Sequence, residues 1–124
     1  TVPITMSNVT HTYHLIMTPM TWSAAQDYCR KTYNDLAIVE SSNDQLSIAA
    51  EALKYSMTSP GWIGLYNNVD SWRWSINNVP LKVTAVTNWA PSEPSNSGAC
   101  GTIDPSGYWS AKPCSSLSTF VCYD

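Results

Sequence analysis

The strongest apolar run in the chain is Trp62–Tyr66, and turn residues flank it on both sides. Its β-branched and aromatic residues favour a buried strand, and Trp72–Trp74 is typical of a short return strand. Gly64 lies inside the run without a side chain to pack, so we expect another backbone or a large ring to approach it closely. Because each tryptophan can bury about 150–250 Å², the core should centre on these two strands.

Two amphipathic helices are predicted in the first half of the chain. Trp22–Lys31 repeats its interior positions at i, i+3 and i+7 behind Thr21, a favoured N-cap residue, so Cys29 should face inward. A second helix is predicted from Asp44 to Tyr55, with capping residues at Ser41–Asn43. Its apolar positions recur at i, i+3, i+4 and i+7 and should face the core; they are Leu46, Ala49, Ala50 and Leu53.

Shorter apolar runs predict three further strands, which are Tyr13–Met17, Leu36–Val39 and Phe120–Tyr123. Pro19 should end the first of them. The succession of strand, helix, strand, helix and then several strands indicates an α+β fold. A chain of 124 residues is long enough for one core, so we expect a lead-in at residues 1–12 and one domain at 13–124.

The chain changes character between Ser75 and Pro113, where Ser, Asn, Thr, Pro and Gly dominate and charges are few. Short apolar pieces interrupt this segment, among them Val83–Val86, and we assign its tryptophans, like Trp62, Trp72 and Trp74, to the core rather than to ligand stacking. So long a loop region is uncommon in a compact domain unless it has a function. We therefore expect the binding surface here, with Tyr108 as a candidate contact residue.

Composition excludes several classes of function. Charged residues make up 12% of the chain, the net charge is −3 and the sequence pI is about 5.1, with no cluster of Lys and Arg. Nucleic acid and anionic membrane surfaces are therefore poor partners. No apolar run approaches the length of a membrane span, so we expect a mature domain or an ectodomain fragment that does not insert. We also predict that the protein is not an enzyme, because it carries none of the common catalytic motifs.

The cysteines and one sequon indicate an extracellular protein, either secreted or the ectodomain of a membrane receptor. The four cysteines, at 29, 100, 114 and 122, include no C-x-x-C pair, which argues against zinc and predicts two disulfides in an oxidising compartment. Sequence alone allows three pairings. The segment Asn8-Val9-Thr10 is an N-glycosylation sequon, so Asn8 is a candidate glycan site.

Many short motifs in this order resemble the C-type lectin-like domain in its short, four-cysteine form. The likeness runs from Tyr13 to Asp124 and is close to domains of the macrophage mannose receptor type. It implies two helices, a small antiparallel sheet that joins the termini, a long loop region that carries the ligand site, and the disulfides Cys29–Cys122 and Cys100–Cys114. The motifs that carry it are Tyr13-His14-Leu15, Thr21-Trp22, Ala25-Gln26, Tyr28-Cys29, Asp35-Leu36-Ala37, Trp62–Leu65, Trp72-x-Trp74-Ser75, Asn88-Trp89, Glu93-Pro94, Trp109 with Cys114, and Phe120-Val121-Cys122.

The calcium ligands that the resemblance implies are mostly replaced. Sugar-binding members hold calcium with a Glu-Pro-Asn or Gln-Pro-Asp loop, an acidic residue two places before the third-from-last cysteine, and an Asn-Asp pair after a tryptophan. Here Glu93 stands, but the other places hold Ser95, Gly98, Ser110 and Ala111. Because calcium requires six to eight oxygen ligands, we expect this site to be lost and predict no cofactor, with Glu93 a weak metal candidate.

The prediction is therefore a non-enzymatic recognition domain that binds an extracellular protein or other ligand without calcium through the long loop region. A first alternative is a carbohydrate-binding lectin with a degenerate or rearranged calcium site that uses Glu93, Asp104 and backbone carbonyls. A second is ice binding, which the low charge permits. The partner, whether protein or glycan, and the oligomeric state are left open. The candidate contact residues are Glu93, Ser95, Asn96, Tyr108 and Ser110.

Overall fold

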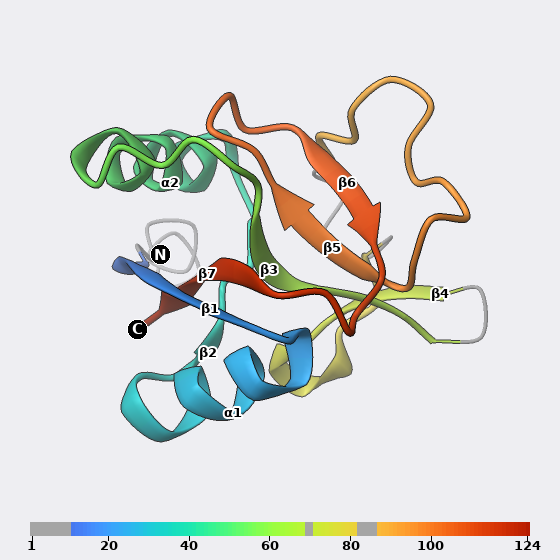
Figure 1. The fold of residues 1–124 in the computed structure, drawn as a ribbon, viewed down its shortest axis with the longest axis horizontal. Helices are drawn as coiled ribbons and strands as arrows, with labels where there is room; N and C mark the ends of the chain where they lie inside the picture. Colours follow the sequence, from blue (N-terminus) through green and yellow to red (C-terminus); the bar gives the residue numbers. More distant parts are fainter. Residues whose placement is uncertain (1–10, 69–70, 82–86) are drawn as a thin grey trace, which may run out of the picture.

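The computed structural model describes residues 11–68, 71–81 and 87–124, and within them two α-helices lie on either side of the strands that carry the chain ends (Figure 1). The predicted α+β fold is confirmed. The candidate glycan site at Asn8 and the apolar segment Val83–Val86 lie outside the described residues. The elements in chain order are β1 (Tyr13–Met20), α1 (Trp22–Thr32), β2 (Asp35–Leu36), α2 (Ser42–Lys54), β3 (Gly61–Asn68), β4 (Ser71–Trp74), a 3₁₀ turn η2 (Ile76–Asn78), β5 (Cys100–Ile103), β6 (Trp109–Lys112) and β7 (Ser118–Tyr123).

One mixed sheet joins these strands in the order β1-β7-β3-β5-β6, with β2 also paired to β7 and β4 to β3. The first and last strands pair antiparallel with Tyr13 opposite Tyr123, so the sheet holds the beginning and end of the domain together. The link between β7 and β3 is parallel and consists of the pair Trp62 and Phe120. The strands β3, β5 and β6 then continue antiparallel and carry the long loop on their far side.

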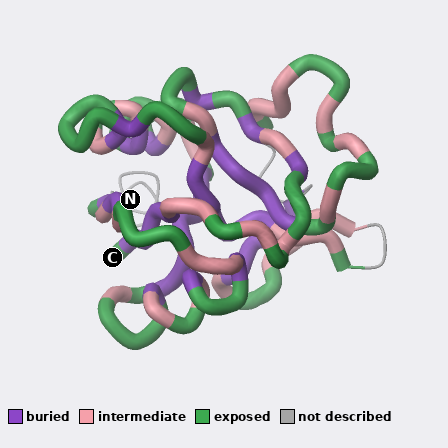
Figure 2. The backbone as a smooth tube through the Cα atoms, in the orientation of Figure 1, coloured by how far each residue is buried: buried purple, intermediate pink, exposed green. Residues whose placement is uncertain are grey.

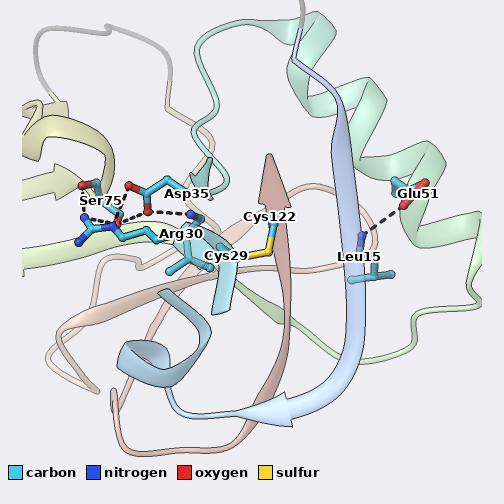
Figure 3. Close-up of a disulfide and its surroundings, with 8 residues drawn as sticks. Leu15, Cys29, Arg30, Asp35, Glu51, Ser75 and Cys122 are labelled. Atoms are coloured by element: carbon cyan, nitrogen blue, oxygen red, sulfur yellow. Dashed lines mark hydrogen bonds and ion pairs between the residues drawn. A yellow bond between two sulfur atoms is a disulfide. The ribbon is translucent and has the colours of Figure 1, made fainter. Parts of the chain in front are cut away.

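Helix α1 is fixed to this sheet as predicted. The Thr21 hydroxyl accepts a hydrogen bond from the amide of Ala24 at 3.3 Å, and Cys29 is fully buried and bonded to Cys122 of β7. Figure 3 shows the polar contacts beside this disulfide, in which the Arg30 guanidinium and the Ser75 hydroxyl both bind the buried carboxylate of Asp35. The helix, β2 and the end of β4 are therefore tied together around one satisfied charge.

The predicted core face of the second helix was wrong. The buried positions of α2 are Asp44, Ile48 and Ala52, whereas Leu46 and Leu53 are 68% and 83% exposed. The capping interactions explain the difference: the Asp44 carboxylate accepts the amide of Glu40 while its own amide donates to the Ser41 hydroxyl, which turns this residue inward. Since the helix repeats every 3.6 residues, Ile48 and Ala52 then follow Asp44 onto the buried face.

The tryptophan strands form the centre of the core, as expected. Trp62, Trp74 and Trp109 are fully buried, and the rings of the last two pack edge to face at 5.6 Å. Trp72 was also predicted to lie in the core, but it is half-buried and packs against Trp89 at the margin. Figure 2 shows buried backbone along the central strands and exposed residues around the 91–99 loop.

Another segment of backbone lies close to Gly64, as predicted from the position of this glycine inside a buried strand. A Cβ there would lie 2.9 Å from the carbonyl oxygen of Ala37, to which the Gly64 amide donates a hydrogen bond at 2.8 Å. The segment that contains Ala37 was predicted as the strand Leu36–Val39, but the ladder with β7 ends at Leu36. Strand β1 conversely runs past Pro19 to Met20, through an irregularity in its pairing.

The predicted loop region contains two strands that its composition concealed. β5 and β6 pair antiparallel, with Ile103 opposite Trp109 and Cys100 opposite Lys112. Disulfide Cys100–Cys114 joins the same hairpin, which is the pairing that the resemblance implies. None of the helices within the described residues is both long and apolar enough to cross a membrane.

Candidate ligand-binding loop

The segment before β5 lies along the outer edge of β6. The amide of Trp109 donates to the carbonyl of Asn88 at 2.8 Å, and the amide of Ala90 donates to the carbonyl of Trp109 at 2.9 Å. Trp89 and Trp109 thereby form a parallel bridge, with their rings 5.6 Å apart. Residues 88–90 thus act as a short extra strand that sets the position of the loop following them.

The side chain of Glu93 continues the hydrogen bonding along β6, where a backbone carbonyl would otherwise accept. Its Oε1 accepts hydrogen bonds from the amide of Ala111 at 3.0 Å and from the amide of Ser95 at 2.9 Å. Its own amide donates to the carbonyl of Ala90 at 2.9 Å, and the Glu93–Pro94 peptide is cis. The carboxylate therefore occupies the place of the next strand residue and ties the loop to β6.

The charge of Glu93 is stabilised in this position. Partial burial acts to raise the pKa of its carboxyl, but the amide donors of Ala111 and Ser95, the Ser95 hydroxyl and the nearby charge of Lys112 together outweigh burial, so the pKa lies below its usual value. Glu93 is thus ionised at neutral pH while acting as a structural acceptor.

Gly98 lies against the far end of β6. A Cβ at this residue would be 2.0 Å from the carbonyl carbon and oxygen of Lys112 and 2.3 Å from the nitrogen of Pro113, well inside any allowed contact. The obstructing atoms belong to backbone, which cannot rotate away as a side chain can. A residue with a side chain, such as the acidic ligand that the resemblance implies at this position, does not fit without displacement of the loop.

The remaining candidate positions offer few free oxygens. The Ser95 hydroxyl donates to Ser97 at 2.8 Å, Asn96 is exposed, and Ala111 is 1% exposed with its side chain in the core. Ser110 is half-buried, and its carbonyl accepts the hydroxyl of Thr102 at 3.2 Å. The surface around Glu93 is therefore made mainly of serine and asparagine.

Tyr108 and Asp104, also singled out in the sequence, lie at the opposite end of the β5–β6 hairpin. One oxygen of Asp104 accepts the amides of Ser106 at 2.8 Å and Tyr108 at 3.0 Å, which closes the turn, and Tyr108 is 46% exposed. Tyr108 and Ala111 are three positions apart in extended chain, a distance of about 10 Å. The structure thus brings Glu93, Ser95 and the Ser110–Ala111 segment together and places Tyr108 apart.

Sequence reasoning missed a cluster of possible metal ligands, His11, Glu40 and Asp44, each with one ligand atom within 4.8 Å of the others. His11 was interpreted as a residue of the lead-in. The i, i+4 spacing of Glu40 and Asp44 could have indicated that the two carboxylates lie close together, but the sequence gives no sign that His11, from a distant segment, joins them. The cluster is internally paired, since His11 Nε2 lies 2.8 Å from Glu40 and Asp44 caps α2 through the Glu40 amide.

The disulfide-tied loop beside β6 is rich in uncharged polar residues, as the resemblance to the C-type lectin-like domain implied. The comparisons agree: the chain belongs to the family described as the Lectin C-type domain, whose model matches residues 18–124. This confirms the resemblance found in the sequence.

The chain is similar in sequence to a selectin and a mannose receptor, and similar in fold to lithostathine. The chain is 33% identical over 122 residues to E-selectin of Bos taurus, covering 92% of this chain and 24% of that protein. It is 32% identical over 121 residues to C-type mannose receptor 2 of Mus musculus, covering 94% and 8% respectively, so it spans a quarter or less of either relative. Among solved structures, human lithostathine shares the fold with a TM-score of 0.82 at 22% identity, covering 93% of this chain and 92% of that one.

Proposed function

We propose that this domain recognises an extracellular protein or glycan through the loop beside β6, and that it does so without calcium. The observation that carries the proposal is the state of Glu93, whose Oε1 already accepts two backbone amides. Calcium would have to compete with both donors for that oxygen, and Ala111 and Gly98 supply no side-chain oxygen in compensation. The donor set falls short of the six to eight oxygens that calcium requires.

The electrostatics of the loop support the same proposal. Lys112 follows Ala111 on β6 and, after the amide donors of Ala111 and Ser95, adds to the lowering of the pKa of Glu93. A positive charge beside the loop also repels a divalent cation. What the loop presents instead is the hydroxyl of Ser95 and the exposed amide of Asn96, so we infer a neutral polar ligand bound by direct hydrogen bonds.

The cysteines support an extracellular location. Two disulfides, Cys29–Cys122 and Cys100–Cys114, close sequence separations of 93 and 14 residues, and such bonds persist in oxidising compartments. The similarity to a selectin and a mannose receptor supports a place in a longer receptor chain.

A calcium titration followed by thermal unfolding tests the proposal. A ligand of the native state at 100 times its Kd raises stability by about 2.7 kcal/mol, so a site filled at millimolar calcium would give a plain rise in Tm. We expect no rise. A rise that Glu93→Gln abolishes would overturn the proposal, and a rise that survives this substitution would place the ion elsewhere, with His11, Glu40 and Asp44 the first residues to test.

Binding itself is tested on a glycan array and on candidate cell-surface proteins, each in calcium and again in chelator. We expect any signal to be equal in both buffers and to fall when Asn96 is replaced by Ala, with Thr87→Ala, also exposed, as the matched control. Binding that requires calcium would favour the rearranged lectin site, although Asp104 closes a turn at the far end of the hairpin from Glu93. Thermal hysteresis in a freezing assay would favour ice binding instead.

A further inference from the structure

Helix α2 presents an apolar stripe to solvent. Leu46 and Leu53 are 68% and 83% exposed, and Ala50 between them is exposed as well. The helix lies at the outside of the molecule, with its buried face turned toward β1 (Figure 1). Soluble proteins place single apolar residues on their surface freely, but a stripe two helical turns long that faces away from the core needs a physical reason.

Two shallow hollows border this stripe on the side of the β5–β6 turn. One, of about 290 Å³, is lined by residues that include Leu46, Ala49 and Gly107, and the other, of about 220 Å³, by residues that include Ala49, Leu53 and Pro105. They share Ala49, so they adjoin along the helix, with Leu46 at one and Leu53 at the other. Among the described residues, no charged side chain lines either hollow.

The residue pattern of the stripe is symmetric along the helix: Leu46, Ala49, Ala50 and Leu53 are placed evenly about the midpoint between the two alanines. In a pair of antiparallel helices related by a two-fold axis at that midpoint, Leu46 of one copy faces Leu53 of the other, and the reverse holds at the other end. We propose that α2 is a self-association surface, through which two copies of this chain pair antiparallel with Ala49 and Ala50 at the axis.

The geometry suits such a pair. Leu46 and Leu53 are seven residues apart, about 10.5 Å along the axis, so each leucine reaches the hollow beside its counterpart on the second copy. The small alanines at the centre allow the helices to approach to the lower end of the usual 8–10 Å.

Charge favours the antiparallel arrangement over the parallel one. Antiparallel helices align their dipoles favourably, and they keep the Lys54 side chains in the last turns of the two copies apart. Parallel helices would place the two lysines side by side. The four residues of the stripe itself are uncharged.

A single helix pair buries less than the roughly 1,200 Å² typical of stable interfaces, so the dimer is weak and depends on concentration. Its use is multivalency: two loop faces held together bind a repetitive surface more tightly than one. This proposal does not depend on whether the loop binds without calcium, because α2 and the loop beside β6 are separate segments of the chain.

Sedimentation velocity of the whole chain over a range from about 10 µM to 1 mM tests the association. We expect the weight-average mass to rise with concentration, and Leu53→Glu to weaken dimerisation at least about tenfold. Leu117→Glu is the matched control, since Leu117 is as exposed as Leu46 but lies in the turn before β7, and it should change nothing. A chain that stays monomeric throughout, or equal effects of both variants, would refute the proposal.

Charge reversal distinguishes the antiparallel pair from other arrangements. The double variant L46E/L53E places like charges opposite each other and should be monomeric, whereas L46E/L53K places Glu opposite Lys twice and should dimerise again, in a salt-sensitive manner. In a parallel pair both variants would repel equally, which would contradict the model. If Leu53→Glu instead lowers Tm without changing the mass, the stripe is covered within the chain and the proposal fails.

Discussion

Replacement of Gly98 by alanine tests the idea that the loop is held tightly against β6. The new Cβ would lie 2.0 Å from backbone atoms of Lys112, whereas carbon atoms in ordinary contact are about 3.5 Å apart. The loop must therefore move by about 1.5 Å. It cannot move freely, because the Cys100–Cys114 disulfide and the Glu93 bond to Ala111 anchor it on both sides.

The expected cost follows from these numbers. Overpacking of this kind costs about 1–3 kcal/mol, and the reduced freedom of the unfolded chain returns about 0.4–1 kcal/mol, so the middle of the two ranges gives a net loss of about 1.3 kcal/mol. For a domain of this size the loss corresponds to a fall in Tm of roughly 3–10 °C. The displaced loop should also draw Glu93 away from the amide of Ala111, whose hydrogen exchange should then accelerate.

Urea unfolding and calorimetry measure the loss, with Asn96→Ala in the same loop as the control, which should stay within about 0.5 kcal/mol of the parent. Gly98→Asp should be destabilised at least as much and should gain no stability from calcium, because the displaced carboxylate has no partner ligand at Ala111. If Gly98→Ala is as stable as the control, the close contact with Lys112 does not exist in solution and the account of the lost metal site fails.

Three further changes have defined outcomes. Removal of the Cys29–Cys122 disulfide, which spans a sequence separation of 93 residues, should cost about 4–5 kcal/mol in urea unfolding. Burial first, and then the nearby carboxylates, raise the pKa of the Tyr13 hydroxyl. The contribution of Tyr13 to stability is therefore complete below about pH 10 and is lost above it. Tyr13→Phe should flatten this alkaline loss, and it should cost about 1–3 kcal/mol because it leaves the Ile38 carbonyl unpaired. The pKa of Glu93 is lowered, so its contribution is present above about pH 4.3 and lost as pH falls further, and Glu93→Gln should flatten this acid loss.

Each of these outcomes has a control. Tyr108→Phe, at an exposed phenol, should change the free energy of unfolding by less than about 0.5 kcal/mol, and an equal loss in both tyrosine variants would contradict the role given to Tyr13. Asp27→Asn, on the exposed side of α1, should likewise stay within about 0.5 kcal/mol of the parent at neutral pH. A reduced protein as stable as the oxidised one would contradict the stabilisation expected for the disulfide.

The sequence alone determined the elements with strong local signals. The tryptophan run of β3, the Thr21 cap of α1 and the inward cysteine of that helix followed from periodicity and turn chemistry, which depend on neighbouring residues. The close approach of another backbone to Gly64 was predictable, because a glycine inside a buried strand commonly marks a place where another chain segment comes near. The ligand replacements at Gly98 and Ala111 were readable once the resemblance fixed their positions.

Tertiary structure decided what local patterns left ambiguous. The stripe of Leu46 and Leu53 fits an amphipathic helix as well as Ile48 and Ala52 do, and only docking of α2 against β1, fixed by the inward cap of Asp44, selected the second set. The strands β5 and β6 lie in a segment of low β-propensity, and pairing across the hairpin, with its disulfide, creates them. The use of Glu93 as a surrogate strand residue depends on an amide 18 positions away, a contact that sequence periodicity cannot encode.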